Sequence, residues 1–329
     1  MSGARKISWN KHMILLLLLI FWAAMIITNP AFRNVDNLLN ILRESAFTGI
    51  TALGMTYCII MGDFDLSVGS MLALMAVVCV RLLNICNMWL AFILILILGV
   101  ICGAFNGFII AYLKISAFIV TLGTFYIFRA AAYIITDGKT VVYSDRFFMF
   151  LGNGSIMKMP VPFCVFVILA AAASVILRHS VYGRSVIGMG NSPKACEISG
   201  INTKFTKMSI FIILGGFTAV SAILTASRQA SAGPGMAGNF HFDAITMVVL
   251  GGTSLAGGEG SIFNTVIAAV FYTSMSSCMN LYHIDTQWQR IFMGLVLLAA
   301  FSADLLKHAG GQMRRKRNLN NIGEKEETT

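Results

Sequence analysis

Charged residues are scarce in this chain. Asp, Glu, Lys and Arg make up only 12% of the 329 residues, whereas hydrophobic residues make up 57%. A soluble domain carries about twice that charged fraction, so we exclude a soluble enzyme or a nucleic-acid-binding domain. The net charge of +10 is better explained by membrane topology, because Lys and Arg gather on cytoplasmic loops.

The residue patterns of common catalytic and metal sites are missing. The five histidines are scattered, without an H-x-x-x-H or H-E-x-x-H pair, and there is no G-x-S-x-G sequence. The seven cysteines include no C-x-x-C pair and lie mostly in apolar runs, where they are typical of small buried side chains. The sequence therefore predicts no catalytic residue, no metal site and no cofactor bound by this chain.

Acidic residues are absent from the middle of the apolar runs. All fourteen lie in loops, at the edges of apolar segments or in the C-terminal tail. Proton-coupled carriers need a carboxylate or histidine inside the membrane, so the sequence argues against a proton symporter. Sodium coupling through backbone carbonyl groups stays open.

A phosphate-binding loop is also missing. The segment Gly251–Gly260 has suitable glycine spacing, but Gly258 and Glu259 stand where such a loop needs Lys and Ser or Thr. The glycines, with Thr253 and Ser254, are more typical of a broken helix that lines a cavity.

Long apolar runs are what the chain has instead. Since a span needs roughly 20 apolar residues, we predict an all-α polytopic membrane protein with about ten spans; nine is the competing count. The expected ranges are 13–28, 45–62, 66–83, 88–111, 115–136, 161–178, 207–227, 242–257, 261–282 and 290–306. The eighth is short and glycine-rich, so we expect a broken or re-entrant helix there.

The distribution of basic residues predicts the topology. The basic, then apolar, N-terminus resembles a signal peptide but lacks a small-residue cleavage site, so we expect a retained first span. Alternating the spans from a cytoplasmic N-terminus places most Lys and Arg inside. Both termini are then cytoplasmic, as is the polar segment at about 179–206. We expect the charged tail 307–329 to be disordered and to fix topology or contact anionic lipid.

The turn 62–70 joins the second and third expected spans. Asp65 precedes Leu-Ser-Val and is predicted to cap the third helix, since its carboxylate can accept from free backbone N–H groups. The turn is either a capped connection only or one that also moves during transport. Its candidate gating or path residues are Asp63, Asp65 and Ser67.

Other polar residues lie within the expected spans. Asn106, Thr121 and Thr124 are either interhelical contacts or part of the translocation path. The remaining candidate path residues are Asn106, Thr121, Thr253 and Ser254.

The most informative stretch is a polar, basic island, Gly183–Ile201, between two apolar segments. Ser192 followed by Pro193 is a helix start signal and Gly200 a stop signal, which predicts one short helix. This helix either grips a partner or only lies along the membrane surface. The candidate partner-coupling residues are Gly183, Arg184, Asn191, Ala195, Glu197, Ile198, Ser199 and Gly200.

Several blocks in order resemble the permease subunit of ribose/xylose/arabinose-type ABC importers, from about residue 37 to 304. These blocks are Gly54-Met-Thr, Gly62–Ser70, Asn106-Gly, Phe118–Gly123, Tyr182-Gly-Arg with Gly190-Asn and Ser199–Ile201, Ala226–Arg228, and Asp243-Ala-Ile with Gly251–Ser261. Two departures are Gly62-Asp63, where the family often has Gly-Gly, and Ser116-Ala117, where it often has Pro-Pro.

The resemblance implies a membrane permease domain at 1–306 that carries a monosaccharide or a related small polar solute. It places the permease in the bacterial inner membrane. It also implies a second permease copy or paralogue, a cytoplasmic ATPase that binds ATP and Mg, and an extracytoplasmic substrate-binding protein. The island would couple to the ATPase. Two alternatives stay open: a self-sufficient secondary carrier or channel, and an ABC permease for a branched-chain amino acid or nucleoside.

Overall fold

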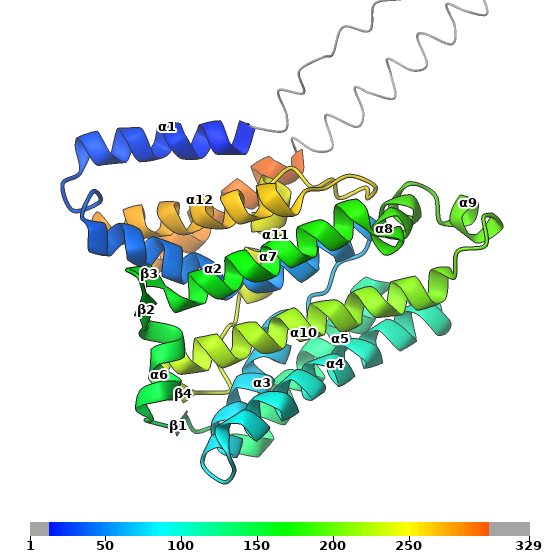
Figure 1. The fold of residues 1–329 in the computed structure, drawn as a ribbon, viewed down its shortest axis with the longest axis horizontal. Coiled ribbons are helices and arrows are strands. Elements are labelled where there is room, and N and C mark those ends of the chain that lie inside the picture. Colours follow the sequence, from blue (N-terminus) through cyan, green and yellow to red (C-terminus); the bar gives the residue numbers. More distant parts are fainter. Residues whose placement is uncertain (1–12, 303–329) are drawn as a thin grey trace, which may run out of the picture. The chain divides into compact units, whose positions relative to one another are not determined.

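The computed structural model describes residues 13–302, and most of them are helical. The predicted helical class is therefore confirmed, and Figure 1 shows how helices dominate the fold. The described strands are only two residues long and form two antiparallel pairs, β1 with β4 and β2 with β3. The first residues and the tail 307–329, with its predicted disorder, lie outside the described residues.

The elements up to residue 284 follow in chain order. The helices are α1 (Met13–Thr28), α2 (Val35–Met61), α3 (Val68–Leu83), α4 (Met88–Tyr112), α5 (Ala117–Thr136), α6 (Arg146–Asn153), α7 (Val161–His179), α8 (Val181–Asn191), α9 (Pro193–Ile198), α10 (Thr203–Gln229), α11 (Phe240–Leu250) and α12 (Ile262–Leu281). The strands are β1 (Val141–Val142), β2 (Ser155–Ile156), β3 (Met159–Pro160) and β4 (Ser231–Ala232).

Most expected ranges agree with these bounds to within a few residues, but two were wrong. Helix α2 begins at Val35 rather than at residue 45, because its first turns are polar yet capped by Asn34, whose side chain accepts from the Asp36 N–H. Helix α11 ends at Leu250 instead of residue 257, and the glycine-rich stretch 251–261 is not helical. Glycine disfavours a helix interior, which accounts for the early end.

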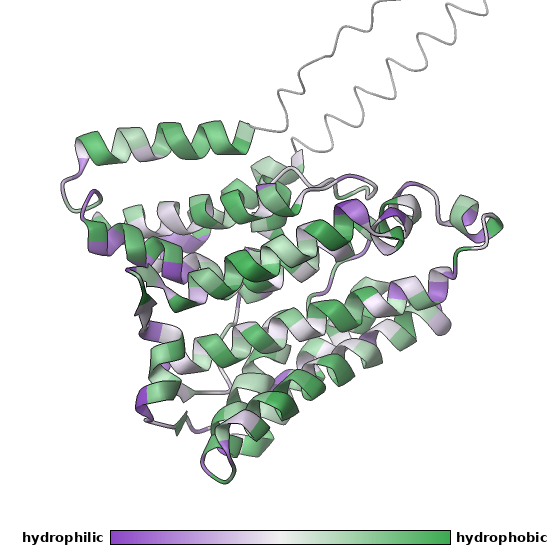
Figure 2. Ribbon diagram, viewed as in Figure 1, coloured by the Kyte–Doolittle hydropathy of each residue, from purple (hydrophilic) through white to green (hydrophobic). Residues whose placement is uncertain are grey.

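Five described helices are long and apolar enough to cross a membrane: α4, α5, α7, α10 and α12. Helices α1, α3 and α11 are apolar but shorter. Figure 2 shows hydrophobic residues along the helix bodies, with hydrophilic residues mainly near helix ends and in the connections.

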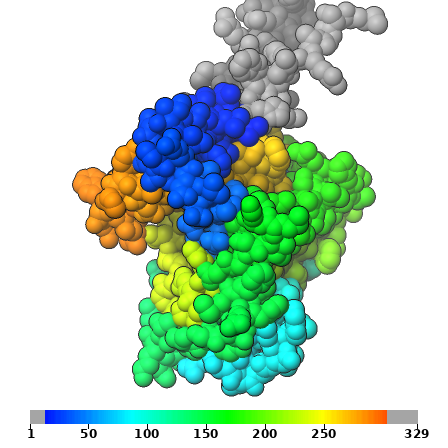
Figure 3. All heavy atoms as spheres, turned by 60° about the vertical axis from the view of Figure 1, so that its left-hand side comes forward, coloured from blue at the N-terminus to red at the C-terminus, as the bar shows by residue number. Residues whose placement is uncertain are grey.

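Helix α2 lies at the centre of the unit formed by the residues up to 284. It packs against α7, α10, α11 and α12, and nearly every residue from Ser45 to Met61 is buried. Its contact with α7 is visible on the face shown in Figure 3.

Helices α4 and α10 approach each other closely through glycines. A Cβ at Gly103 would lie 2.2 Å from the Phe211 carbonyl oxygen, and one at Gly99 would lie 2.5 Å from that of Gly215. Small residues of this kind permit close packing between membrane helices.

The described residues from Asp285 onward belong to a second unit. Within it, residues 286–302 are helical. This segment overlaps the last expected span, 290–306, whose end lies outside the described residues.

Candidate functional site

Two segments that the sequence singled out separately, the island and the glycine-rich stretch, meet near the end of α2. The Gly258 N–H, in the glycine-rich loop, donates to the Ile60 carbonyl at 2.8 Å. A Cβ at Gly190, near the end of α8, would lie 1.9 Å from the same oxygen and 2.3 Å from the Gly258 nitrogen. We call Ile60, Gly190, Gly257 and Gly258 the glycine joint. It links the island directly to α2 and to the loop before α12 (Figure 1).

The loop side of the joint needs glycine for its backbone conformation. Gly257 and Gly258 have φ angles of +84° and +80°, a left-handed region that other residues rarely adopt. Thr253 and Ser254 are both buried here. The Ser254 hydroxyl accepts from the Ala256 N–H at 3.2 Å, so it bonds a backbone group of this non-helical stretch.

The turn after α2 contains a buried polar cluster. The Asp65 carboxylate accepts from the Ser67 N–H at 2.7 Å, from the Ser67 hydroxyl at 2.6 Å and from the Asn106 amide at 3.1 Å. The predicted helix cap was thus wrong in position: Asp65 accepts from a backbone N–H, but the capping position is Ser67, whose side chain makes no capping bond. Asp65 instead ties the turn to α4 through Asn106.

Asp63, in the same turn, contacts a different helix. Its carboxylate lies 2.6 Å from the Lys207 ammonium group, near the start of α10, and both side chains are largely buried. The turn is therefore held to α4 by Asp65 and to α10 by Asp63. The sequence analysis used the basic residues only to predict topology and missed this pair.

The island contains two helices rather than the one that we predicted. Helix α8 was missed because Gly183, Gly188 and Gly190 lower its apparent helix propensity. It begins where the Ser180 hydroxyl accepts from the Gly183 N–H at 2.9 Å.

Helix α9 follows the predicted signals. Ser192 is its N-cap and accepts from the Ala195 N–H, Pro193 is its first residue, and Gly200 has a φ of +81° just beyond its end. Cys196 is buried, and its sulfur would lie 2.9 Å from a Cβ at Gly188 in α8. Of the eight candidate coupling residues, only Gly183 is buried; the exposed ones are Arg184, Asn191, Ala195, Glu197, Ile198, Ser199 and Gly200.

A tyrosine ties α8 to α10. The hydroxyls of Tyr182 and Ser209 lie 2.8 Å apart and share a hydrogen bond. Burial raises the pKa of the Tyr182 phenol to about 12, although the bond to Ser209 opposes the shift. The phenol therefore stays protonated, and this tie does not change over the physiological pH range.

The two threonines of α5 act within their own helix. Thr121 donates to the Ala117 carbonyl at 2.7 Å, and Thr124 donates to that of Val120 at 3.1 Å. Such bonds satisfy a buried hydroxyl without joining helices. Asn106 differs from these two threonines, because its amide donates hydrogen bonds to residues outside its own helix, Asp65 and Ser67.

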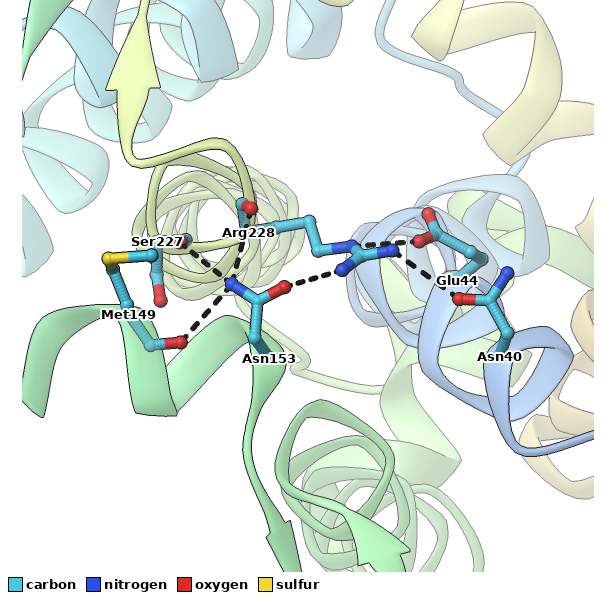
Figure 4. A network of polar contacts seen from close by, with 6 residues as sticks. All are labelled: Asn40, Glu44, Met149, Asn153, Ser227 and Arg228. Carbon is cyan, nitrogen blue, oxygen red and sulfur yellow. Dashed lines mark hydrogen bonds and ion pairs between the residues drawn. The ribbon is translucent and has the colours of Figure 1, made fainter. Parts of the chain in front are cut away.

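A second polar cluster lies at the opposite end of α10 (Figure 4). Arg228 donates to the Glu44 carboxylate at 3.0 Å, to the side-chain oxygen of Asn40 at 3.4 Å and to the side-chain oxygen of Asn153. Asn153, the last residue of α6, donates in turn to the carbonyls of Met149, Ser227 and Arg228. The cluster joins α2, α6 and α10.

Helices α2 and α10 thus form an antiparallel pair with an ion pair at each end. Between Glu44–Arg228 and Asp63–Lys207, the buried Ser221 hydroxyl donates to the Phe47 carbonyl. A Cβ at Gly54 would lie 2.9 Å from the Leu214 Cα. The α10 partners recur every seventh residue (Lys207, Leu214, Ser221 and Arg228), which keeps them on one side of the helix. We call this line of contacts the α2–α10 seam. The seven-residue spacing was the signal in the sequence that could have revealed it.

The family follows from comparison with known proteins. The sequence matches the family model described as the permease component of branched-chain amino acid transport systems, over residues 37–301. The chain belongs to this permease family. No solved structure matches the permease.

Curated relatives match the permease over nearly their whole lengths. The ribose import permease protein RbsC of Haemophilus influenzae is 36% identical over 300 residues, which are 90% of this chain and 92% of the relative. The L-arabinose transport system permease protein AraH of Escherichia coli is 34% identical over 313 residues, 93% and 95% of the two chains. RbsC of Bacillus subtilis is 35% identical over 286 residues, 86% and 89% of the two.

Membership defines the general role of the chain. It is the transport component of a permease system rather than a catalytic enzyme. With several apolar helices, it is a multi-pass protein of the bacterial inner membrane.

Proposed function

We propose that this permease forms the translocation path of an ATP-driven importer for a monosaccharide. The observation that carries the substrate class is the similarity, over most of both chains, to permeases named for ribose and L-arabinose. The importer would contain a second permease copy or paralogue and an extracytoplasmic binding protein. A cytoplasmic ATPase would bind ATP and Mg.

The substrate and the energy source are tested together in liposomes. The permease is reconstituted with its ATPase and binding protein, and uptake of D-ribose, L-arabinose and D-xylose is measured with and without ATP. We expect ATP-dependent uptake of at least one sugar. Uptake by the permease alone would instead support a secondary carrier or channel. ATP-dependent uptake of only an amino acid or nucleoside would support a different substrate class.

We also propose that the island, within the cytoplasmic segment 179–206, docks on the ATPase. Helix α9 offers the exposed side chains of Ala195 and Ile198, while Cys196 holds the helix against α8. Contacts of a helix in a groove use residues spaced by three or four positions, as these two are. The glycine joint then connects α8 to α2, so a displacement of α9 reaches the membrane helices.

The docking proposal is tested with Ala195→Glu, which adds bulk and charge to the exposed face. We expect the ATPase to be lost on co-purification and uptake to be abolished, with normal amounts of permease in the membrane. The control is Lys158→Glu, which adds an acidic side chain at the exposed β2–β3 turn, away from α9. If Ala195→Glu binds the ATPase and transports normally, the island is only a surface helix.

We further propose about ten spans with both termini in the cytoplasm. The excess of basic residues on the resulting inner side supports this topology. A C-terminal alkaline phosphatase fusion, active only outside the cytoplasm, is expected to be silent. An active fusion would place the island on the wrong side for an ATPase.

A further inference from the structure

The non-helical segment 233–239, between β4 and α11, lies deep beside α5. Arg129 donates to the carbonyls of Pro234 at 2.7 Å and Met236 at 2.6 Å, and it also reaches that of Ala237. Arg129 stands two turns before Thr136, the last residue of α5, which is roughly 10 Å along a helix axis. The segment therefore enters alongside a membrane-spanning helix rather than lying at its end.

The first turn of α3 lies next to segment 233–239, at the same depth in the membrane. A Cβ at Gly69, in the first turn of α3, would lie 2.7 Å from the Ala237 carbonyl oxygen. Arg81, near the other end of α3, donates to the Ile135 carbonyl at the end of α5. Since Gly69 is roughly 18 Å below Arg81 along α3, the first turns of α3 and α11 meet inside the membrane-spanning region.

The segment is exposed at this depth. Gly235, Gly238 and Asn239 are all exposed, and a Cβ at Gly238 would meet no atom within 4 Å. Non-helical backbone at membrane depth does not face lipid, because its polar groups would lack partners there. It has to face protein or a water-filled space.

The junction also holds a buried polar atom without a partner. His241, in the first turn of α11, is only 6% exposed, and its Nδ1 has no hydrogen-bond partner among the described residues. This Nδ1 would lie 3.3 Å from a Cβ at Gly69, so it faces the first turn of α3. Neither Ser67 nor Asn239 caps its helix with its side chain. Two helix N-termini, which favour electronegative atoms, thus meet an unpaired imidazole nitrogen.

Aromatic residues of α5 flank the segment. The Tyr133 hydroxyl would lie 3.6 Å from a Cβ at Gly235. Tyr126, two turns earlier on the same side of α5, is 66% exposed. Aromatic faces and hydrogen-bonding tips together suit a solute with both apolar and hydroxyl-bearing sides.

We propose that segment 233–239 and the first turn of α11 line the translocation path and contact a neutral, hydroxyl-rich solute. Arg129 already donates to three carbonyls, so the cation of this junction is not free to bind a carboxylate. By contrast, Asp65, Ser67, Asn106, Thr121, Thr253 and Ser254, which the sequence suggested for the path, are all buried within the permease. The solute class rests on the proposed function; the position of the path does not.

The position is tested with Gly238→Cys, because a side chain fits there without contact. Membranes that contain the assembled transporter are treated with the charged reagent 2-sulfonatoethyl methanethiosulfonate. Ile97→Cys, at an exposed position in the middle of α4, is the matched control, and the parent chain with its seven cysteines is the blank. Asn239→Cys is the second variant if Gly238→Cys does not assemble.

We expect the cysteine at 238 to react at least about tenfold faster than that at 97, since the reactive thiolate forms in water and not in hydrocarbon. Modification is also expected to block uptake. A rate no faster than at position 97 overturns the inference and indicates contact with protein or lipid. If none of the three sugars is taken up in the liposome assay, the sugar assignment is overturned. The labelling rate still tests the position of the path independently.

Discussion

At the scale of single residues, two glycines in helices have opposite surroundings. A Cβ at Gly190 would collide with the Ile60 carbonyl and the Gly258 backbone, whereas a Cβ at Gly216 in α10 would meet nothing within 4 Å. The first glycine is required for close approach and the second is not. The same substitution at both positions separates the effect of crowding from that of helix propensity.

We predict that Gly190→Ala destabilises the permease by about 1–3 kcal/mol, the usual cost of overpacking, and lowers uptake. Gly216→Ala should instead be neutral or stabilising by up to about 1 kcal/mol, because alanine favours a helix. Thermal unfolding in detergent and ATP-dependent uptake measure both variants. Equal effects of the two substitutions would show that the glycine joint does not depend on close contact.

Polar residues within apolar helices also differ from one another. Asn106 donates to Asp65 in another element, while Thr124 donates only to its own helix. We predict that Asn106→Ala costs about 1–3 kcal/mol, because it leaves a buried carboxylate oxygen of Asp65 without a partner. Thr124→Val has nearly the same shape and should change stability little. Denaturation of the purified variants measures this difference, and an equally harmful Thr124→Val would contradict it.

The sequence predicted local signals well and long-range partners poorly. Ser192, Pro193 and Gly200 marked α9 correctly because capping depends on neighbouring residues. Asp65 was placed in the right turn and accepts from a backbone N–H as predicted, but Ser67 takes the capping position, and the bond from Asn106 on another helix was missed. A single sequence does not indicate which distant amide reaches a carboxylate.

At the scale of elements, the ion pairs at the two ends of α2 and α10 differ in their surroundings. Lys207 contacts only Asp63 among the described acidic groups. Arg228 contacts Glu44 and also donates to the side-chain oxygens of Asn40 and Asn153 (Figure 4). Asp63 and Lys207 therefore form an isolated ion pair, while Glu44 and Arg228 belong to a hydrogen-bonded network.

We predict that exchanging the charges rescues one pair only. Asp63→Lys and Lys207→Asp should each lower uptake, and the double variant should restore it, with a coupling of about 1 kcal/mol in stability. The corresponding Glu44→Arg with Arg228→Glu should stay impaired, because a carboxylate at 228 would face the side-chain oxygen of Asn153, whose amide is held in this orientation by its bonds to three carbonyls. Double-mutant cycles of thermal stability and uptake measure both couplings. Rescue at both ends would mean that the amides contribute nothing.

The sequence predicted the bounds of those helices that consist of apolar residues throughout. Apolar runs gave the bounds of α1, α4 and α7 almost to the residue. The start of α2 and all of α8 were missed, because their polar or glycine-rich turns are stabilised by caps and tertiary contacts rather than by composition.

At the scale of the whole permease, the described contacts run continuously from α9 to the Arg228 cluster. Cys196 fixes α9 to α8, the glycine joint fixes α8 to α2, and the α2–α10 seam leads to Arg228. Apart from the seven-residue spacing along α10, this path was not predictable from the sequence, because every step joins residues far apart in the chain. The family, in contrast, was recognisable from short blocks in the right order.

The burial of α2 has a consequence for how the chain enters the membrane during synthesis. Helix α2 carries Asp36, Arg43 and Glu44 and is not among the five helices that suffice by length and apolarity. Its neighbour α10, which pairs with Glu44, is made much later. We therefore expect a nascent chain that ends before Thr203 to hold α2 weakly in the membrane, so that a protease reaches this segment. A chain extended past Gln229 should retain it, and equal protection of α2 in both lengths would show that it inserts unaided.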